Sequence, residues 1–182
     1  RVLADARTRR TIRFCFFGSE EARLLGSVAH VEAIRREDSQ TVEGLLNLDG
    51  VGVATEAADS QEAPIRIPLI TWLPSTGNFI AVVGNLSSGW LGNLFEEAVD
   101  VYVPGLPYYS ANRLGGMVQV SWFGDHAPYW KAGYPAILLS DTSSLRHGRY
   151  HQPSDTPDTL NYTFLRQVAQ AAAATVLEWA DR

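Results

Sequence analysis

The chain has little cysteine, no long apolar run and no excess of basic side chains, and each shortage excludes a class of protein. Its single cysteine, Cys15, rules out an intrachain disulfide. No stretch reaches the roughly 18 consecutive apolar residues of a membrane-spanning helix. The formal net charge of −5 disfavours nucleic acid as a general partner, because phosphate binding needs a basic surface. A hydrophobic content of 46% over 182 residues is instead typical of one globular domain with a sizeable core.

Strand-like apolar runs alternate with segments of helical periodicity. The strand-like runs are 11–17, 42–49, 65–72, 118–122 and 136–140. The helical segments are 26–36, with an N-cap at Gly26-Ser27, 87–99 and 162–180. Pro68 favours an edge position for its strand. Because strands alternate with helices, and two of the strands are continuously apolar, the pattern predicts an α/β fold with a mostly parallel sheet.

Acidic or imidazole side chains follow three of the predicted strands where each strand ends. Glu20 and Glu21 follow the first strand, Asp49 follows the second, and the loop after the last strand carries His151. Ligands of such folds bind beyond the carboxyl ends of the strands, and carboxylates with imidazole are the ligands of a zinc hydrolase. Alternatively, the two glutamates simply open the next helix, where negative charge suits the helix dipole. The residues alone leave both interpretations open.

Four motifs, in family order, resemble metallopeptidase family twenty-eight, the di-zinc aminopeptidases. They span residues 16–27, 45–52, 124–139 and 150–160. The resemblance implies a three-layer α/β/α sandwich of the zinc-exopeptidase type with a mostly parallel central sheet. It also implies that residues 1–182 form a single peptidase-like domain, incomplete at its N-terminus because its first strands are missing.

The resemblance also implies roles for individual residues. Glu20 matches the general base that takes a proton from a metal-activated water. Glu21 and His151 match ligands of one zinc ion, and Asp49 matches a ligand of the other. Tyr150 matches the residue whose hydroxyl stabilises the tetrahedral oxyanion.

Five further polar residues leave their roles more open. Asp125 matches an acid near the zinc in related glutaminyl cyclases, or it caps a helix with a structural His126 beside it. Asp155 is predicted to order the His151 loop, as a partner of a metal ligand. His30 and His147 are predicted to be a helix-surface residue and a solvated one.

The chain departs from the family pattern upstream of Glu20. The family has a histidine in a His-x-Asp motif and a bridging aspartate there, and Asp5, in an Arg-rich stretch, matches neither. Since zinc sites normally use three or four protein ligands, both metal positions would be weak without these groups. We expect residues 1–182 alone to be inactive. A start at Arg1 without Met favours a piece of a longer enzyme over a shortened, inactive relative.

The family resemblance implies a zinc-dependent exopeptidase, an aminopeptidase that cleaves N-terminal peptide bonds with two zinc ions. Its substrates would be peptide or protein N-termini, and the family favours a secreted, periplasmic or membrane-attached location. Oligomeric state stays open. Two alternatives are a glutaminyl-peptide cyclase and a non-catalytic binding domain. The cyclases usually carry histidine after the acid pair, whereas residue 22 is Ala.

Overall fold

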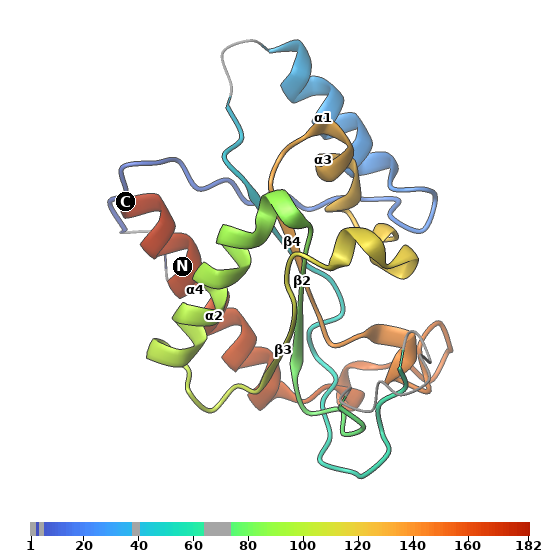
Figure 1. Cartoon of the computed structure of the whole chain (residues 1–182). Coiled ribbons are helices and arrows are strands. Elements are labelled where there is room, and N and C mark those ends of the chain that lie inside the picture. The colour runs from blue at the N-terminus through green and yellow to red at the C-terminus, as the bar shows by residue number, and fades with distance from the viewer. Residues whose placement is uncertain (1–2, 4–5, 38–40, 64–73) are drawn as a thin grey trace.

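A computed structural model describes the chain apart from residues 1–2, 4–5, 38–40 and 64–73 (Figure 1). The described residues form one four-stranded sheet and four α-helices. The strands are β1 Leu45–Leu48, β2 Ile80–Gly84, β3 Tyr108–Ala111 and β4 Ala136–Ser140. The helices are α1 Leu25–Arg36, α2 Gly89–Tyr102, α3 Ala127–Ala132 and α4 Tyr162–Asp181. Within this part of the chain, no helix combines the length and apolarity needed to cross a bilayer.

The sheet is mixed, with strand order β1-β4-β2-β3. β1 runs parallel to β4 and β2 runs parallel to β3, whereas β2 and β4 are antiparallel. The predicted α/β class is therefore confirmed, and two of the three strand pairings are parallel. Because β1 and β4 are parallel, their C-terminal ends lie side by side. Asp49, which follows β1, is therefore close to the end of β4.

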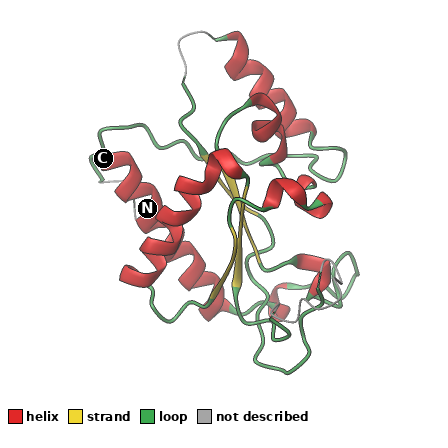
Figure 2. Ribbon diagram, viewed as in Figure 1, coloured by secondary structure: helices red, strands yellow, loops and turns green. Residues whose placement is uncertain are grey.

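Alternate side chains of the strands enter two apolar clusters. Ile137 and Leu139 join a large cluster with side chains of α2 and α4. Their neighbour Ala136 instead contacts a smaller cluster built from α1 and α3. Since successive side chains of a strand point to opposite faces, helices pack on both faces of the sheet (Figure 2). Fully buried side chains such as Phe95 each stabilise the fold by about 1.5–3 kcal/mol.

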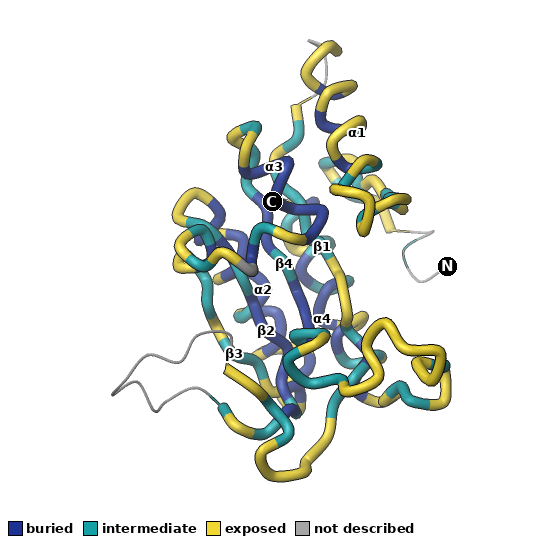
Figure 3. The backbone as a smooth tube through the Cα atoms, turned by 90° about the vertical axis from the view of Figure 1, so that its right-hand side faces the viewer, coloured by how far each residue is buried: buried dark blue, intermediate teal, exposed yellow. Residues whose placement is uncertain are grey.

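The predicted strand at 11–17 is wrong. No described strand pairs with this run, so it does not belong to the four-stranded sheet. Its side chains still alternate: Phe14 and Phe16 are 67% and 95% exposed, whereas Cys15 and Phe17 are half-buried. Figure 3 shows that the helix that follows, α1, is also mostly exposed, whereas the strands β2 and β4 are mostly buried.

Other boundaries differ from the sequence pattern for local reasons. The run 118–122 is wound into a 3-10 turn, Gln119–Trp122, and is not a strand. The first helix begins after its N-cap Leu24, which has a φ of 61°, so the predicted N-cap at Gly26-Ser27 is wrong. β2 and β3 were not predicted, and the strand candidate 65–72 lies outside the described residues. The helices predicted at 87–99 and 162–180 are confirmed as α2 and α4.

Candidate active site

Glu20 and Glu21 lie in a tight turn that is packed against the start of α1. Ser19 adopts a φ of 59°, and the backbone N–H of Leu24 donates to the Glu20 carbonyl at 2.8 Å. The N–H of Gly26 donates to the Gly18 carbonyl at 3.1 Å, so close that a Cβ on Gly26 would lie 2.6 Å from that oxygen. A glycine is therefore required where the turn meets the helix.

Glu21 meets His151 across 130 residues of sequence. The two side chains are joined by a 2.7 Å contact between His151 Nε2 and Glu21 Oε1. His151 has a φ of 59°, an uncommon backbone conformation for a non-glycine residue that is typical of functional sites. The ring of Tyr150 stacks on that of His151 with centroids 4.0 Å apart. The structure thus brings together three of the residues predicted for the site.

Glu20 and Asp49 lie among other carboxylates, and both have raised pKa values. The pKa of Glu20 is raised by partial burial and then by the negative charges of Asp49 and Glu21. Asp49 keeps an exposed side, yet the protein atoms around it partly desolvate its carboxylate. This desolvation raises the pKa of Asp49, and repulsion from Asp125 raises it further. Adjacent carboxylates that resist ionisation are typical of a site that accepts a cation.

Asp125 is buried beside this group and is bound by a serine. The Ser27 hydroxyl donates to Asp125 Oδ1 at 2.5 Å, from a position inside α1. Asp125 does not cap α3, whose N-cap is His126 with no side-chain hydrogen bond, so that alternative is wrong. We refer to Glu20, Glu21, Asp49, Asp125, Tyr150 and His151 as the polar cluster.

The polar cluster fits zinc in its chemistry but holds no complete metal geometry. Carboxylate oxygens and an imidazole nitrogen are the donors that zinc prefers, and Glu21 and His151 are already in contact. Among the residues that the structure describes, however, no three histidine, cysteine or acidic side chains are arranged to hold an ion. The described residues therefore present donor atoms of the kind that zinc prefers, without a complete set of ligands.

The remaining predicted side chains lie outside the polar cluster. His126 is fully buried, and its Nε2 lies 2.7 Å from the Ser121 carbonyl, which supports a structural role. Burial lowers the pKa of His126 to about 4. Asp155 Oδ1 lies 2.9 Å from His147 Nε2, so it fixes the loop through His147, four residues before His151. The solvated position predicted for His147 is wrong, because its side chain is only 11% exposed.

His30 is also more than a helix-surface residue. It is half-buried, and its Nδ1 lies 2.6 Å from the hydroxyl of Tyr129. This contact links α1 to α3 behind the turn that carries the two glutamates. The sequence did contain a signal for this position, because His30 follows Ser27 by three residues and precedes Ile34 by four, the spacing of the buried face of α1.

Two polar residues near the site were not predicted, Asp141, which is buried, and Arg146, which is half-buried. Asp141 follows β4 and is 2% exposed, and its carboxylate accepts hydrogen bonds from backbone N–H groups. Arg146 donates to the carbonyls of Val53 and Phe79 at 3.0 and 2.9 Å, and its guanidinium lies over the Phe79 ring. Burial lowers the pKa of Arg146 to about 10. The only signal for Asp141 was an acid directly after a buried strand.

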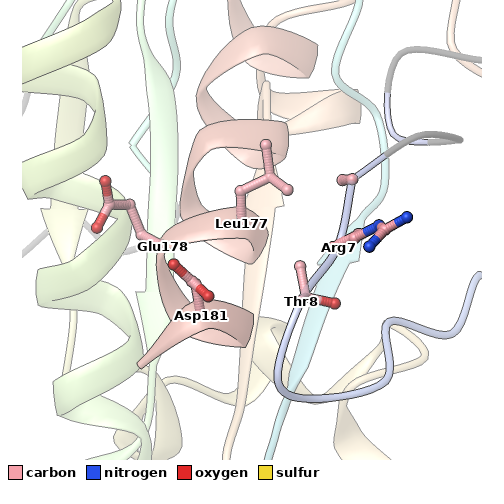
Figure 4. Close-up of a pocket in the computed structure, with 6 residues that line it drawn as sticks. Arg7, Thr8, Leu177, Glu178 and Asp181 are labelled. Atoms are coloured by element: carbon pink, nitrogen blue, oxygen red, sulfur yellow. The ribbon is translucent and has the colours of Figure 1, made fainter.

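A groove of about 280 Å³ lies elsewhere, between α4 and residues 6–8 (Figure 4). It is lined by Ala6, Arg7, Thr8, Leu177, Glu178 and Asp181. None of these residues belongs to the polar cluster, so the groove is not part of the candidate site.

The described residues thus combine an α/β fold with carboxylates and an imidazole gathered at one edge of the sheet. Residues 1–176 match peptidase family M28, and the chain belongs to this family.

Three relatives illustrate the similarity. The chain is 35% identical over 154 residues to the uncharacterized protein YfbL of Escherichia coli K12, covering 84% of this chain and 44% of that protein. It is 26% identical over 171 residues to leucine aminopeptidase 1 of Pyrenophora teres f. teres, covering 93% and 38%. The structure of BSAP, a zinc aminopeptidase from Bacillus subtilis, matches with a TM-score of 0.71 at 23% identity, covering 100% and 38%. The chain therefore spans less than half the length of these relatives.

Proposed function

We propose that this chain carries part of the active site of a zinc-dependent aminopeptidase acting on peptide N-termini. The observation that carries the proposal is the contact between Glu21 and His151, made beside the raised-pKa carboxylate of Glu20. A relative named leucine aminopeptidase 1 and a structural neighbour titled as a zinc aminopeptidase support the same activity.

In this proposal Glu21 and His151 hold one zinc ion and Asp49 contributes to a second. Zinc, when bound, polarises the peptide carbonyl and acidifies water. Since zinc sites normally use three or four protein ligands, further ligands from the full-length protein complete both positions.

Glu20 acts as the general base and then delivers its proton to the leaving amine. A carboxylate suits this role when its pKa is raised toward the working pH, as burial and the neighbouring carboxylates do here. Tyr150 donates its hydroxyl proton as a hydrogen bond to the developing oxyanion. Stacking against His151 holds the phenol ring at the edge of the site.

The substitution Glu20→Gln in the full-length protein tests the proposal. We expect turnover of an aminoacyl anilide to fall by about 10²–10⁴-fold, because an amide cannot accept the proton. Zinc content, measured by elemental analysis, should stay near the wild-type value, since Glu20 is not a ligand. Glu32→Gln, on the exposed face of α1, is the matched control and should leave both quantities unchanged.

Retention of most activity by the Glu20→Gln protein contradicts the assignment of the base. An assay with a peptide carrying N-terminal glutamine runs in parallel. Cyclisation of that peptide without anilide hydrolysis would favour a cyclase, and a full-length protein with neither activity nor zinc would favour a binding domain.

A further inference from the structure

The carboxylate of Asp141 is bound entirely by the protein main chain at the end of the central strand β4. Its Oδ2 accepts hydrogen bonds from the N–H groups of Gly52 and Val53 at 3.0 and 2.7 Å. Its Oδ1 accepts from the N–H of Ser143 at 2.9 Å. The side chain is 2% exposed, so these three bonds replace water as its solvent.

These bonds tie together two segments that are far apart in sequence. Gly52 and Val53 lie three and four residues after Asp49, and Ser143 opens the loop that carries Tyr150 and His151. The backbone N–H of Asp141 also donates to the Gly50 carbonyl. One buried side chain therefore connects the segment after one predicted metal ligand to the loop that carries another.

The geometry points to Asp141 as a positioning residue of the zinc site: we propose that its carboxylate holds the Asp49 segment and the His151 loop at the separation that metal binding requires. The inference rests on the proposed function and deepens it. Asp141 contacts no substrate in this scheme and acts only through the main chain of the two segments.

The loop needs such support because its first residues are strained. Thr142 and Ser143 follow each other with φ values of 73° and 45°, conformations that non-glycine residues rarely adopt. Such strain persists only where the surroundings over-determine the backbone. The Ser143 N–H bound by Asp141 supplies one of these constraints.

A second set of bonds supports the same junction from its other side. Arg146 Nε donates to Gln61 Oε1 at 2.8 Å, and Gln61 Nε2 donates to Thr142 Oγ1 at 2.9 Å. The segment after Asp49 and the loop before His151 are thus joined twice, and Arg146 Nη1 also donates to the Val53 carbonyl at 3.0 Å. Asp141 differs from Arg146 in that its carboxylate binds main-chain N–H groups of both segments.

The test uses Asp141→Asn in the full-length protein. An amide keeps the shape but replaces one acceptor oxygen by an NH₂ donor, which must face at least one of the three N–H groups. Amide hydrogen exchange in the metal-free protein should speed up at Gly52, Val53 and Ser143 and stay unchanged in β2. Zinc affinity, measured by chelator competition, should fall about 10- to 100-fold, as for other partners that orient metal ligands. Excess zinc should restore kcat more than it changes KM.

Asp158→Asn is the matched control, because this exposed carboxylate bonds to the side chain of its own turn residue Thr156. If Asp141→Asn does not fold, Asp141→Glu keeps the charge but displaces it, and the same local exchange should rise. Faster exchange with wild-type zinc affinity overturns the positioning role, as does unchanged exchange at all three amides. Failure of the proposed function is distinguished by a wild-type protein that neither binds zinc nor cleaves peptides.

Discussion

Two kinds of acidic side chain lie at the same end of the sheet and differ in what surrounds them. Asp141 is fully buried, and backbone N–H groups bind both of its carboxylate oxygens. Glu20 and Asp49 are less buried, yet other carboxylates are their charged neighbours and their pKa values are raised. Burial alone therefore does not decide how a carboxylate behaves at this edge of the sheet.

The difference shows how the protein separates support from chemistry. Main-chain N–H groups satisfy the carboxylate oxygens of Asp141, and the guanidinium of Arg146 interacts with its charge, so this acid has no need of a ligand. The acids of the polar cluster repel one another, and a bound cation would relieve that repulsion. This contrast between Asp141 and the acids of the polar cluster can be tested by three substitutions. They are at the buried His126, at Gly50, which lies between Asp49 and Asp141, and at Asp49 itself.

The largest effect is expected at His126, the buried imidazole beside Asp125. Its pKa is about 4 in the folded protein and 6.5 ordinarily, so folding favours the neutral ring. As pH falls from 6.5 to 4, the unfolded chain binds a proton that the folded chain resists. The free energy of unfolding should therefore decrease by on the order of 3 kcal/mol across this window.

Urea unfolding of wild type and His126→Gln at pH 7 and pH 4.5 measures this effect. The comparison uses the pH-dependent change within each protein, so that the packing cost of the substitution cancels. The His126→Gln variant should lose most of the pH dependence of its free energy of unfolding. Equal pH dependence in the two proteins would show that another group causes it.

A smaller effect is expected at Gly50, which lies between Asp49 and the Asp141 carboxylate. Gly50 has a φ of 59°, and a Cβ there would lie 2.5 Å from Ser143 Oγ and 3.0 Å from Asp141 Oδ1. Gly50→Ala should lower the free energy of unfolding by about 1–2 kcal/mol from the left-handed backbone alone. Chemical denaturation checks this value. Gly148→Ala is the control, because its Cβ would meet nothing within 4 Å, and equal losses in the two variants would contradict the argument.

The smallest effect is expected for Asp49→Asn without metal. Desolvation, and then repulsion from neighbouring carboxylates, raises the pKa of Asp49 above its ordinary 3.8, so stability falls as pH rises from 3.8 through the folded value. Removing the charge should stabilise the metal-free protein at neutral pH by less than about 1 kcal/mol, because water still screens the side chain. Thermal denaturation with a chelator present should show a higher midpoint. A lower midpoint would mean that Asp49 is not repelled by its neighbours.

The sequence pattern predicted the elements whose signal is local. The apolar run at β4 and the helical periodicity of α2 and α4 are properties of single segments, and all three were found close to their predicted bounds. The run 11–17 has strand composition as well, but a strand also needs a paired neighbour. Composition alone could not reveal the antiparallel pairing of β2 with β4.

The candidate site also has features that the sequence pattern could predict and features that it could not. The rule that ligands gather at strand ends associated Glu21 with His151, and the structure places them in contact. The run before Glu21 is nevertheless not a strand, so the rule gave the right pair from a wrong element. It could not identify Asp141 as a support, because its partners are main-chain N–H groups that a sequence does not distinguish. His30 and His147 were misjudged for a similar reason, since their partners Tyr129 and Asp155 become visible only in the folded chain.

The 130-residue separation between Glu21 and His151 has a consequence for the order of folding. A contact that closes so long a loop is entropically costly until intervening segments have already been shortened by structure. The sheet, with β1 and β4 side by side, must therefore be largely assembled before the two side chains can meet. Formation of the Glu21–His151 contact during refolding would therefore indicate that the sheet has assembled. The backbone hydrogen bonds within the helix α4 are local, and this helix can form much earlier.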